Sequence, residues 1–196
     1  MPVSLTFDDG PEPRWTAAVL DALGEAGARA TFFVLAAKAA REPALVARAL
    51  AEGHEVGLHG DRHLRHTEHD RATIEADTDA ALHRLDVLGV RPTLWRLPWG
   101  RAAAWTPDVA RERGLRIVGW DADTHDWRGD TAAAMLDAVA ADLRDGCIVL
   151  AHDGLGPGAT RDGCGETVAL VGALARLAAE RGLGCVPVGE NDAVPA

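Results

Sequence analysis

The sequence has no long hydrophobic run, and this absence excludes a membrane-spanning helix. Its best apolar stretch, residues 30–37, is far shorter than the roughly 20 residues that a helix needs to cross a bilayer. The first ten residues, MPVSLTFDDG, also lack the basic and apolar regions of a secretory signal peptide. We therefore expect a cytoplasmic protein with no membrane partner.

Basic residues and cysteines are also few. The 196 residues hold 20 Lys and Arg against 30 Asp and Glu, which gives a formal net charge of −10. Nucleic-acid binding depends on clustered positive charge, so this balance argues against a nucleic-acid partner. The three cysteines, Cys147, Cys164 and Cys185, show no paired spacing, and we expect free thiols in a reducing compartment.

Short β-like runs alternate with amphipathic helical patterns along the whole chain. Strands are expected at 3–7, 29–35, 54–59, 93–98, 116–121, 147–152 and 184–188, and helices at 16–26, 43–52, 68–88, 106–113, 131–144 and 166–182. This alternation predicts an α/β fold with a parallel sheet. Seven strands suggest a short or incomplete βα barrel, with an open doubly wound sheet as the alternative. No linker, repeat or low-complexity tract interrupts residues 1–196, so we expect one domain.

The polar residues that suggest chemistry come directly after predicted strands. In parallel βα folds, the loops after the carboxyl ends of the strands build the site. An acidic pair, a histidine pair and the segments RLPWG (96–100), DTHDW (123–127) and LAHD (150–153) each follow or close a different strand. We therefore expect five strand ends to bring these residues to one edge of the sheet.

Two histidines and one carboxylate form a candidate metal site. His59 and His63 are four residues apart in HGDRH, and both can face one ion if this segment forms a helical turn. Asp9 is the best candidate for the third ligand. Such a set leaves positions open for water and substrate, as a catalytic metal requires. Because adjacent carboxylates repel each other, an ion that binds Asp9 would leave Asp8 free as a base.

The other polar residues fit the hydrolysis of an amide. Asp8 is the candidate base that takes a proton from the attacking water, and Arg96 could pair with it and orient it. The turn at Trp99 exposes a backbone N–H that could face a developing oxyanion. His152 could protonate the leaving amine, and Asp126 could orient that imidazole or raise its pKa.

Taken in this order, the motifs TFDDGP, HxxxH, RLPWG, DTHDW and LAHDG resemble the five motifs of the polysaccharide deacetylase family. This family is carbohydrate esterase family 4, with the NodB homology domain. The resemblance runs from Val3 to about Val188 and implies a distorted (β/α)7 barrel as a single domain. It implies a metal-dependent hydrolase that removes an N-acetyl or N-formyl group from an amino sugar. The substrate would be a chito-oligosaccharide or a small intracellular acetylated metabolite.

The resemblance also implies a role for each site residue. Asp9, His59 and His63 would bind a divalent metal, usually Zn²⁺, with Co²⁺, Mn²⁺ or Ni²⁺ as alternatives. Asp8 would be the catalytic base, and Arg96 would hold it in place. Trp99 would donate its backbone N–H to the oxyanion, and His152 would be the acid, with its pKa tuned by Asp126. Trp127 and Leu150 would line the substrate groove.

Two positions depart from the family's usual pattern. Gly60 stands where a Ser or Thr usually follows the first metal histidine, and that hydroxyl steadies the loop. Its loss puts loop rigidity and metal affinity in question. Trp99 stands where Tyr or Phe usually precedes the turn glycine. This change keeps the backbone donor but reshapes the groove.

Two other functions stay open at this point. His59-Gly60-Asp61 is an HxD pattern that, together with His152, could bind the iron of a non-haem oxygenase. Those enzymes usually have an all-β fold, which the helix–strand alternation argues against. The second alternative is a non-catalytic carbohydrate-binding domain, although such domains typically lack the base or a ligand and this sequence has them all. The oligomeric state stays open.

Overall fold

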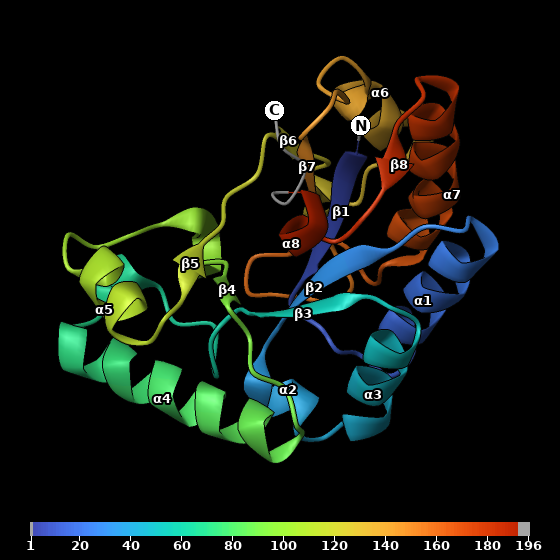
Figure 1. Ribbon diagram of the computed structural model, residues 1–196. Coiled ribbons are helices and arrows are strands. Elements are labelled where there is room, and N and C mark those ends of the chain that lie inside the picture. The colour runs from blue at the N-terminus through green and yellow to red at the C-terminus, as the bar shows by residue number, and fades with distance from the viewer. Residues whose placement is uncertain (1, 192–196) are drawn as a thin grey trace.

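Among residues 2–191, which the computed structural model describes, eight parallel strands form one sheet with helices between them (Figure 1). The strands are β1 (Pro2–Asp8), β2 (Ala30–Val34), β3 (Glu55–Leu58), β4 (Leu94–Trp95), β5 (Arg116–Ile117), β6 (Ala122–Asp123), β7 (Ile148–His152) and β8 (Gly184–Cys185). Their order across the sheet is β5-β4-β3-β2-β1-β7-β6, and β8 pairs with the start of β1.

The six predicted helices are confirmed, and two short ones are added. The helices of the described residues are α1 (Trp15–Glu25), α2 (Ala36–Ala39), α3 (Pro43–Ala51), α4 (Arg71–Val87), α5 (Thr106–Glu112), α6 (Ala132–Ala140), α7 (Gly165–Glu180) and α8 (Val188–Asn191). Helices α2 and α8 have four residues each, too few to show a helical period in the sequence. In Figure 1, α1, α3 and α7 lie to the right of the sheet, and α4 and α5 lie to its left.

The strand predicted at 116–121 is wrong as one element. Its first part, β5, pairs with β4, and the chain then crosses to the other edge of the sheet, where β6 pairs with β7. The backbone shows both attachments, because Val118 N donates to Trp95 O and Asp121 N donates to Ile148 O, each at 2.9 Å. No strand pair joins β5 to β6 within residues 2–191, so the predicted barrel is confirmed in a distorted form with an opening at this point.

The central strand β1 separates the helix-packed core from the interior of the curled sheet. Val3, Leu5 and Phe7 are buried in the main apolar cluster, which also contains side chains of α1 and α7. The alternate residues Thr6 and Asp8 face the other way and both contact Arg96. This is the two-residue alternation of a strand, and it directs Asp8 into the interior of the sheet.

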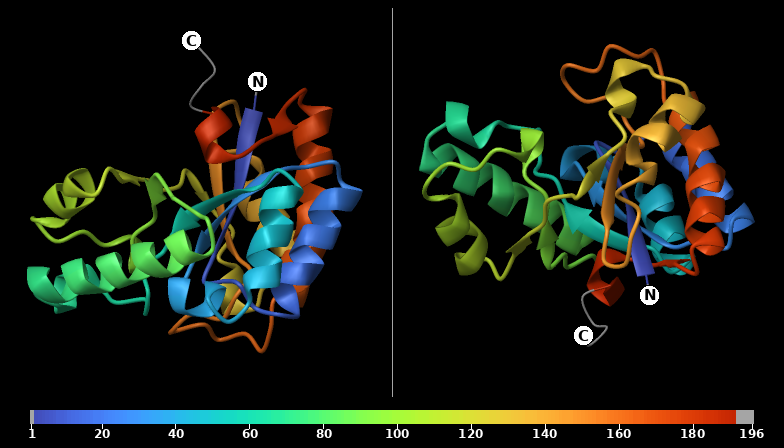
Figure 2. Two further views of the ribbon diagram at one scale, coloured as in Figure 1. Left: turned by 60° about the horizontal axis from the view of Figure 1, so that its bottom comes forward. Right: turned by 90° about the horizontal axis from the view of Figure 1, so that it is seen from above.

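The register of the strands brings the predicted site residues to the same edge. Asp8 of β1 pairs with His152 of β7 on one side and with Phe33 of β2 on the other. Leu58 of β3 pairs with Trp95 of β4, so His59 and Arg96 follow at one level. In the left view of Figure 2, β1 begins at the end marked N, and the orange loop after β7 lies at the opposite end, where the site residues gather.

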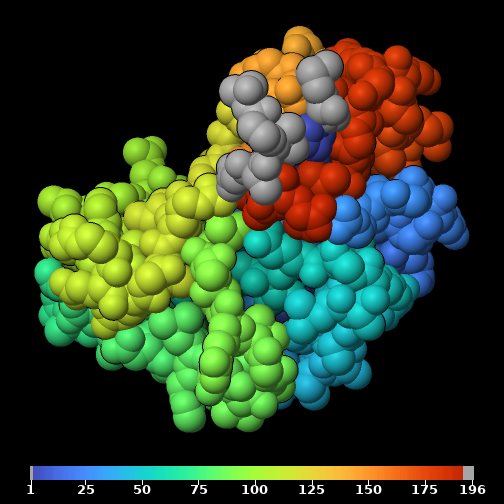
Figure 3. Space-filling model, viewed as in Figure 1, coloured from blue at the N-terminus to red at the C-terminus, as the bar shows by residue number. Residues whose placement is uncertain are grey.

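The start of β1 is covered by α8, which is red in the space-filling view of Figure 3. Val188 N of this helix donates to Thr31 Oγ1 at 2.9 Å. No helix of residues 2–191 is long and apolar enough to cross a membrane. The three cysteines are free thiols, as expected.

Candidate active site

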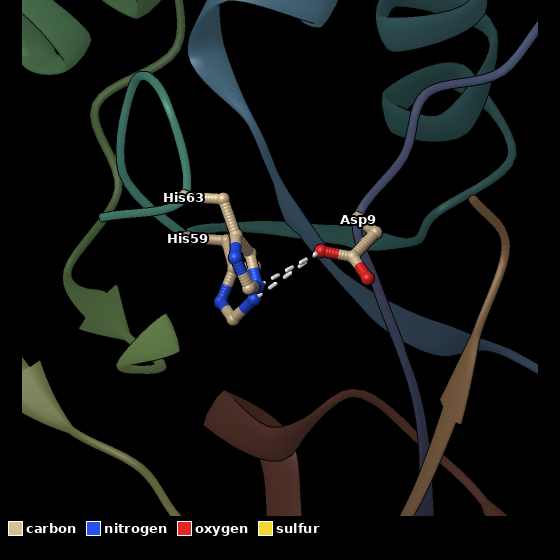
Figure 4. Close-up of side chains that lie close together, drawn as sticks. All are labelled: Asp9, His59 and His63. Atoms are coloured by element: carbon tan, nitrogen blue, oxygen red, sulfur yellow. Dashed lines mark ion pairs between the residues drawn. The ribbon is translucent and has the colours of Figure 1, made fainter. Parts of the chain in front are cut away.

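Asp9, His59 and His63 meet at the carboxyl edge of the sheet (Figure 4). Asp9 directly follows β1 and has a positive φ of 71°, which turns its carboxylate away from that of Asp8 and toward the loop after β3. Its Oδ1 lies 3.3 Å from His63 Nε2 and 3.6 Å from His59 Nε2. The structure therefore brings together the three residues that the sequence predicts as metal ligands.

The geometry of these three side chains fits a divalent cation. Two ligands that are each about 2.0–2.1 Å from a tetrahedral zinc lie about 3.3 Å apart, close to the observed separations. Asp9 Oδ1 is buried and has no hydrogen-bond partner within the described residues. A buried carboxylate oxygen without a partner is costly, and a bound cation would satisfy it.

Both histidines are prepared to offer a lone pair. His59 Nδ1 lies 2.8 Å from the backbone oxygen of Arg96. A carbonyl oxygen only accepts, so Nδ1 carries the proton and Nε2 keeps a free lone pair, as a metal ligand needs. Burial, together with the nearby His59 ring, lowers the pKa of His63 to about 4. Its ring is thus neutral at pH 7, as a metal ligand must be.

A buried carboxylate from α4 anchors the loop that carries the two histidines. Asp77 accepts hydrogen bonds from Asp61 N and from Arg62 Nε, both at 2.9 Å. Gly60 has a φ of +97°, and a Cβ at this position would lie 3.2 Å from Asp77 Oδ2. The loop, which has no side-chain hydroxyl at Gly60, is therefore held in another way. Asp77 accepts a hydrogen bond from the backbone of the next residue, and Gly60 leaves room for the Asp77 carboxylate.

Asp8 and Arg96 form a buried ion pair at the base of the site. Arg96 Nη1 donates to Asp8 Oδ1 at 2.9 Å and to Thr6 Oγ1 at 2.6 Å, and Nη2 donates to the backbone oxygen of Gly119 at 2.8 Å. The guanidinium also lies 4.2 Å from the centre of the Phe33 ring. Because both groups are buried and hydrogen-bonded, Asp8 is held in one orientation, with Oδ2 3.9 Å from His59 Nε2.

On the other flank of the site, His152 is paired with Asp126. Its Nδ1 lies 2.7 Å from Asp126 Oδ1, and Asp126 Oδ2 accepts from Arg161 Nη1 at 2.8 Å. Burial alone would raise the pKa of Asp126, but the hydrogen bond and the charges of His152 and Arg161 outweigh it and bring the pKa to about 2. Burial would lower the pKa of His152, but the hydrogen bond to Asp126 and the charges of Asp126 and Asp8 raise it to about 9.

The candidate metal ligands Asp9, His59 and His63, together with Asp8 and His152, line one cavity of about 360 Å³. This volume is in the range of roughly 300–1,000 Å³ that is typical of small-molecule sites. Trp99, Trp127 and Leu150 line the cavity as the resemblance implies, and Trp120 joins them. Trp99 has a positive φ of 62° and lies in the turn Pro98–Gly100, which begins three residues after the end of β4.

Comparison with known proteins places this geometry in a family. Residues 1–118 match the family model described as polysaccharide deacetylase. The chain belongs to the polysaccharide deacetylase family. It is 39% identical over 164 residues to a chitooligosaccharide deacetylase of Bradyrhizobium sp. (strain ANU 289), a match that covers 81% of this chain and 74% of that protein. The expected family is therefore confirmed.

Two further members of the polysaccharide deacetylase family show how the fold and the length compare. The family 4 carbohydrate esterase from Streptomyces lividans, solved in complex with acetate, has a TM-score of 0.84 and 32% identity over 94% of this chain and 91% of that one. The peptidoglycan-N-acetylglucosamine deacetylase PgdA of Listeria monocytogenes is 40% identical over 154 residues, or 77% of this chain. The present chain matches only 32% of the length of that protein.

Three groups that sequence reasoning missed complete the site. Asp77 and Arg161 hold the histidine loop and the Asp126 carboxylate, and nothing in their spacing distinguishes them from surface charges. Asp153 was given no role by the motif that contains it, but it is buried and accepts from Thr16 Oγ1 at 2.5 Å. Burial, with the nearby Asp9 and Asp8, raises the pKa of Asp153 to about 7. Its position directly after His152 was the one available signal.

The arrangement does not favour the non-haem oxygenase. That function requires Asp61 beside His59 and His152, but Asp61 Oδ1 forms an ion pair with Arg84 Nε at 2.9 Å. The cluster that offers three ligand atoms uses Asp9 and His63 instead. The sheet of parallel strands and helices is also unlike an all-β jelly roll.

Proposed function

We propose that this protein is a metal-dependent N-deacetylase that acts on an N-acetylated or N-formylated amino sugar. The observation that supports it most is the presence of two hydrogen-bonded dyads, Asp8–Arg96 and Asp126–His152, beside one candidate metal site. Hydrolysis of an amide needs a base on one side and an acid on the other. The names of the relatives, which include deacetylases of chito-oligosaccharides and of peptidoglycan, agree with this chemistry.

Asp9, His59 and His63 would hold the metal, which supplies a Lewis acid and lowers the pKa of a water beside it. Zn²⁺ is the cation that this set of ligands suits best. Asp8, fixed by Arg96, would take the proton of the water that attacks the acyl carbon.

The remaining residues act on the substrate. The N–H of Trp99 faces the oxygen that becomes negative in the transition state. His152 then gives its Nε2 proton to the amine nitrogen, so that the C–N bond breaks and acetate and the free amine leave. Asp126 keeps Nδ1 of His152 occupied, which fixes the ring with its other nitrogen toward the cavity.

The cavity suits an amino sugar, because aromatic faces such as those of Trp120 and Trp127 pack against sugar rings and Leu150 offers an apolar surface to an acyl methyl group. We propose a chito-oligosaccharide or a related acetylated sugar as the substrate. The cytoplasmic location expected from the sequence stays a prediction.

The experiment that tests this function measures acetate release from chito-oligosaccharides and peptidoglycan fragments, with zinc and with chelator, for the native protein and for Asp8→Asn. We expect the native protein to release acetate only with metal. Asp8→Asn should lose on the order of 10²–10⁴ in rate while it still binds zinc by calorimetry, because Asp9, His59 and His63 remain.

Asp79→Asn is the matched control, because Asp79 lies on the exposed side of α4, where it pairs with Arg113. It should keep the native rate. If Asp8→Asn deacetylated at the native rate, the assignment of the base would be wrong. If the native protein bound zinc but released no acyl group from any substrate of the panel, the non-catalytic sugar-binding alternative would replace this proposal.

A further inference from the structure

One buried arginine in the loop after β7 contacts both members of the Asp126–His152 pair. Arg161 lies nine residues beyond His152, and its side chain is only 5% exposed. Its Nη1 donates to Asp126 Oδ2 at 2.8 Å, and its Nη2 donates to the backbone oxygen of His152 at 3.0 Å. A single guanidinium therefore holds the carboxylate of one residue and the main chain of the other.

The same guanidinium also joins the segments that follow His152. Nη2 donates to the backbone oxygen of Gly154 at 3.2 Å, and Nη1 donates to Thr167 Oγ1 in the first turn of α7 at 2.6 Å. The Thr167 hydroxyl in turn donates to Asp126 Oδ2 at 2.7 Å. Because the donors of an arginine form a rigid planar fork, these contacts restrain one another, and the carboxylate and the His152 main chain are fixed as one unit.

The two partners of Asp126 differ in how they change during the proposed reaction. His152 Nδ1 uses Oδ1, and the ring is charged before it gives up its Nε2 proton and neutral afterwards. Arg161 uses Oδ2 and keeps its charge throughout, because a guanidinium is not deprotonated in a protein. A buried carboxylate is costly unless it is paired and hydrogen-bonded. Arg161 is therefore the partner that keeps Asp126 in place at both stages.

Arg161 lines the cavity, but both of its Nη groups already donate to acceptors of the protein. We propose that Arg161 is a positioning residue for the acid step, which holds Asp126 and the backbone of His152 in the arrangement that delivers a proton to the leaving amine. This inference rests on the proposed function and adds a residue that acts through Asp126 and His152 rather than on the substrate.

The role has a specific consequence, because only some leaving groups need this proton. The nitrogen of an amide leaves badly unless it is protonated. The p-nitrophenolate of p-nitrophenyl acetate leaves as a stable anion and needs no acid. Loss of a residue that positions the acid should therefore slow the hydrolysis of the amide and spare that of the ester.

The ratio of two rates at saturating zinc tests this inference. One is acetate release from penta-N-acetylchitopentaose, and the other is p-nitrophenolate release from p-nitrophenyl acetate. In both reactions water attacks the acyl carbon and acetate is formed. Arg161→Met removes the guanidinium and keeps a long side chain. We expect it to lower the amide rate by about 10–100-fold and to change the ester rate by no more than about twofold, since the acid is not used there.

Three further variants sharpen the test. Arg161→Lys keeps a positive charge beside Asp126, which protects the fold, but it lacks the planar fork and should show a smaller loss confined to the amide. Asp126→Asn should show the same amide-selective loss, and adding Arg161→Met to it should cost less than in the native protein, because residues that act as a unit are not additive. Arg91→Met is the control and should leave both rates unchanged, since the Arg91 side chain is 87% exposed.

The outcomes separate this inference from the proposed function. If Arg161→Met and Arg161→Lys lower the amide and ester rates by the same factor, the role of Arg161 in the acid step is wrong, although the deacetylase function stands. Folded variants that keep the native amide rate would overturn it as well. If the native protein releases no acetate from the amide, the proposed function itself fails. Melting temperature and zinc affinity show whether each variant is folded and loaded, and Arg161→Lys decides if Arg161→Met does not fold.

Discussion

At the scale of single residues, we expect the Asp126–His152 contact to set the pH range of the proposed reaction. His152 must be protonated to act as an acid, and its pKa is raised to about 9. Activity should therefore persist up to about pH 9 and fall as the pH rises through that value. In Asp126→Asn the negative charge is lost and any remaining hydrogen bond is to a neutral amide oxygen, so burial then favours the neutral ring. The alkaline limb of kcat/KM against pH should move to lower pH.

Thr167→Val is the matched control for this experiment. Thr167 Oγ1 donates to Asp126 Oδ2 at 2.7 Å, but Arg161 still pairs with the same oxygen when the hydroxyl is removed. We expect its alkaline limb to stay near the native position. An Asp126→Asn profile that superimposes on the native profile after scaling would show that Asp126 does not tune the acid.

Asp77 is the residue that we expect to set metal affinity without touching the metal. Asp77→Asn weakens its hold on Asp61 N and Arg62, so the loop with His59 and His63 should be less well ordered before the ion binds. Loss of such an outer contact typically costs about 10–100-fold in metal affinity. Calorimetric titration of the metal-free protein with zinc measures this change directly.

Asp79→Asn on the same helix serves as the control and should bind zinc with native affinity. A role that is only structural would lower the melting temperature of the metal-free protein and leave the zinc dissociation constant unchanged. That result, or unchanged values of both, would rule out the anchoring role of Asp77.

The sequence predicted the residues of the site that stand at fixed places after strands. Asp8 ends β1, Asp9 and His59 come directly after β1 and β3, and His63 lies in the loop after β3, so position in the fold and residue type both pointed to them. Asp77 gave no such signal, because it reaches the site from the middle of a helix. Its importance comes from burial against Asp61, which only the folded chain shows.

At the scale of elements, a strand was predictable where one continuous run of residues pairs with the same two neighbouring strands along its length. The strand β1 was predicted almost to its ends, because its alternate residues face the helices and the interior. The run at 116–121 was not, since its halves pair with β4 and β7 at opposite edges of the sheet. Local sequence does not reveal which edge a residue pairs with, and this break is what makes the barrel distorted.

Helix α7 provides a stability prediction at this scale. It packs against α1 and α6, and Leu174 on its inner face is only 3% exposed. Leu174→Ala should lower the free energy of unfolding by about 2–5 kcal/mol, because it removes buried methyl groups and leaves a cavity. Urea denaturation followed by circular dichroism measures the loss.

Val87→Ala in α4 is the comparison for Leu174, since Val87 is 72% exposed. It should change the free energy of unfolding by about 0.5 kcal/mol or less. Equal effects of the two substitutions would mean that α7 does not pack on the core as described.

At the scale of the whole molecule, the candidate metal site connects parts of the chain that are distant in sequence. Asp9 follows β1, and the two histidines follow β3, so the three ligands come together only in the folded sheet.

A cation that binds only the native state stabilises it by about 2.7 kcal/mol at a free concentration 100 times the dissociation constant. For a chain of this length, each kcal/mol raises the melting temperature by about 2–4 °C. Zinc should therefore raise the melting temperature of the chelator-treated protein by about 5–10 °C. His63→Ala should abolish this rise, because it removes one ligand, whereas His69→Ala, at an exposed position outside the cluster, should preserve it. A melting temperature that is the same in zinc and in chelator would mean that Asp9, His59 and His63 do not bind the ion in the native state, and the proposed chemistry would lose its centre.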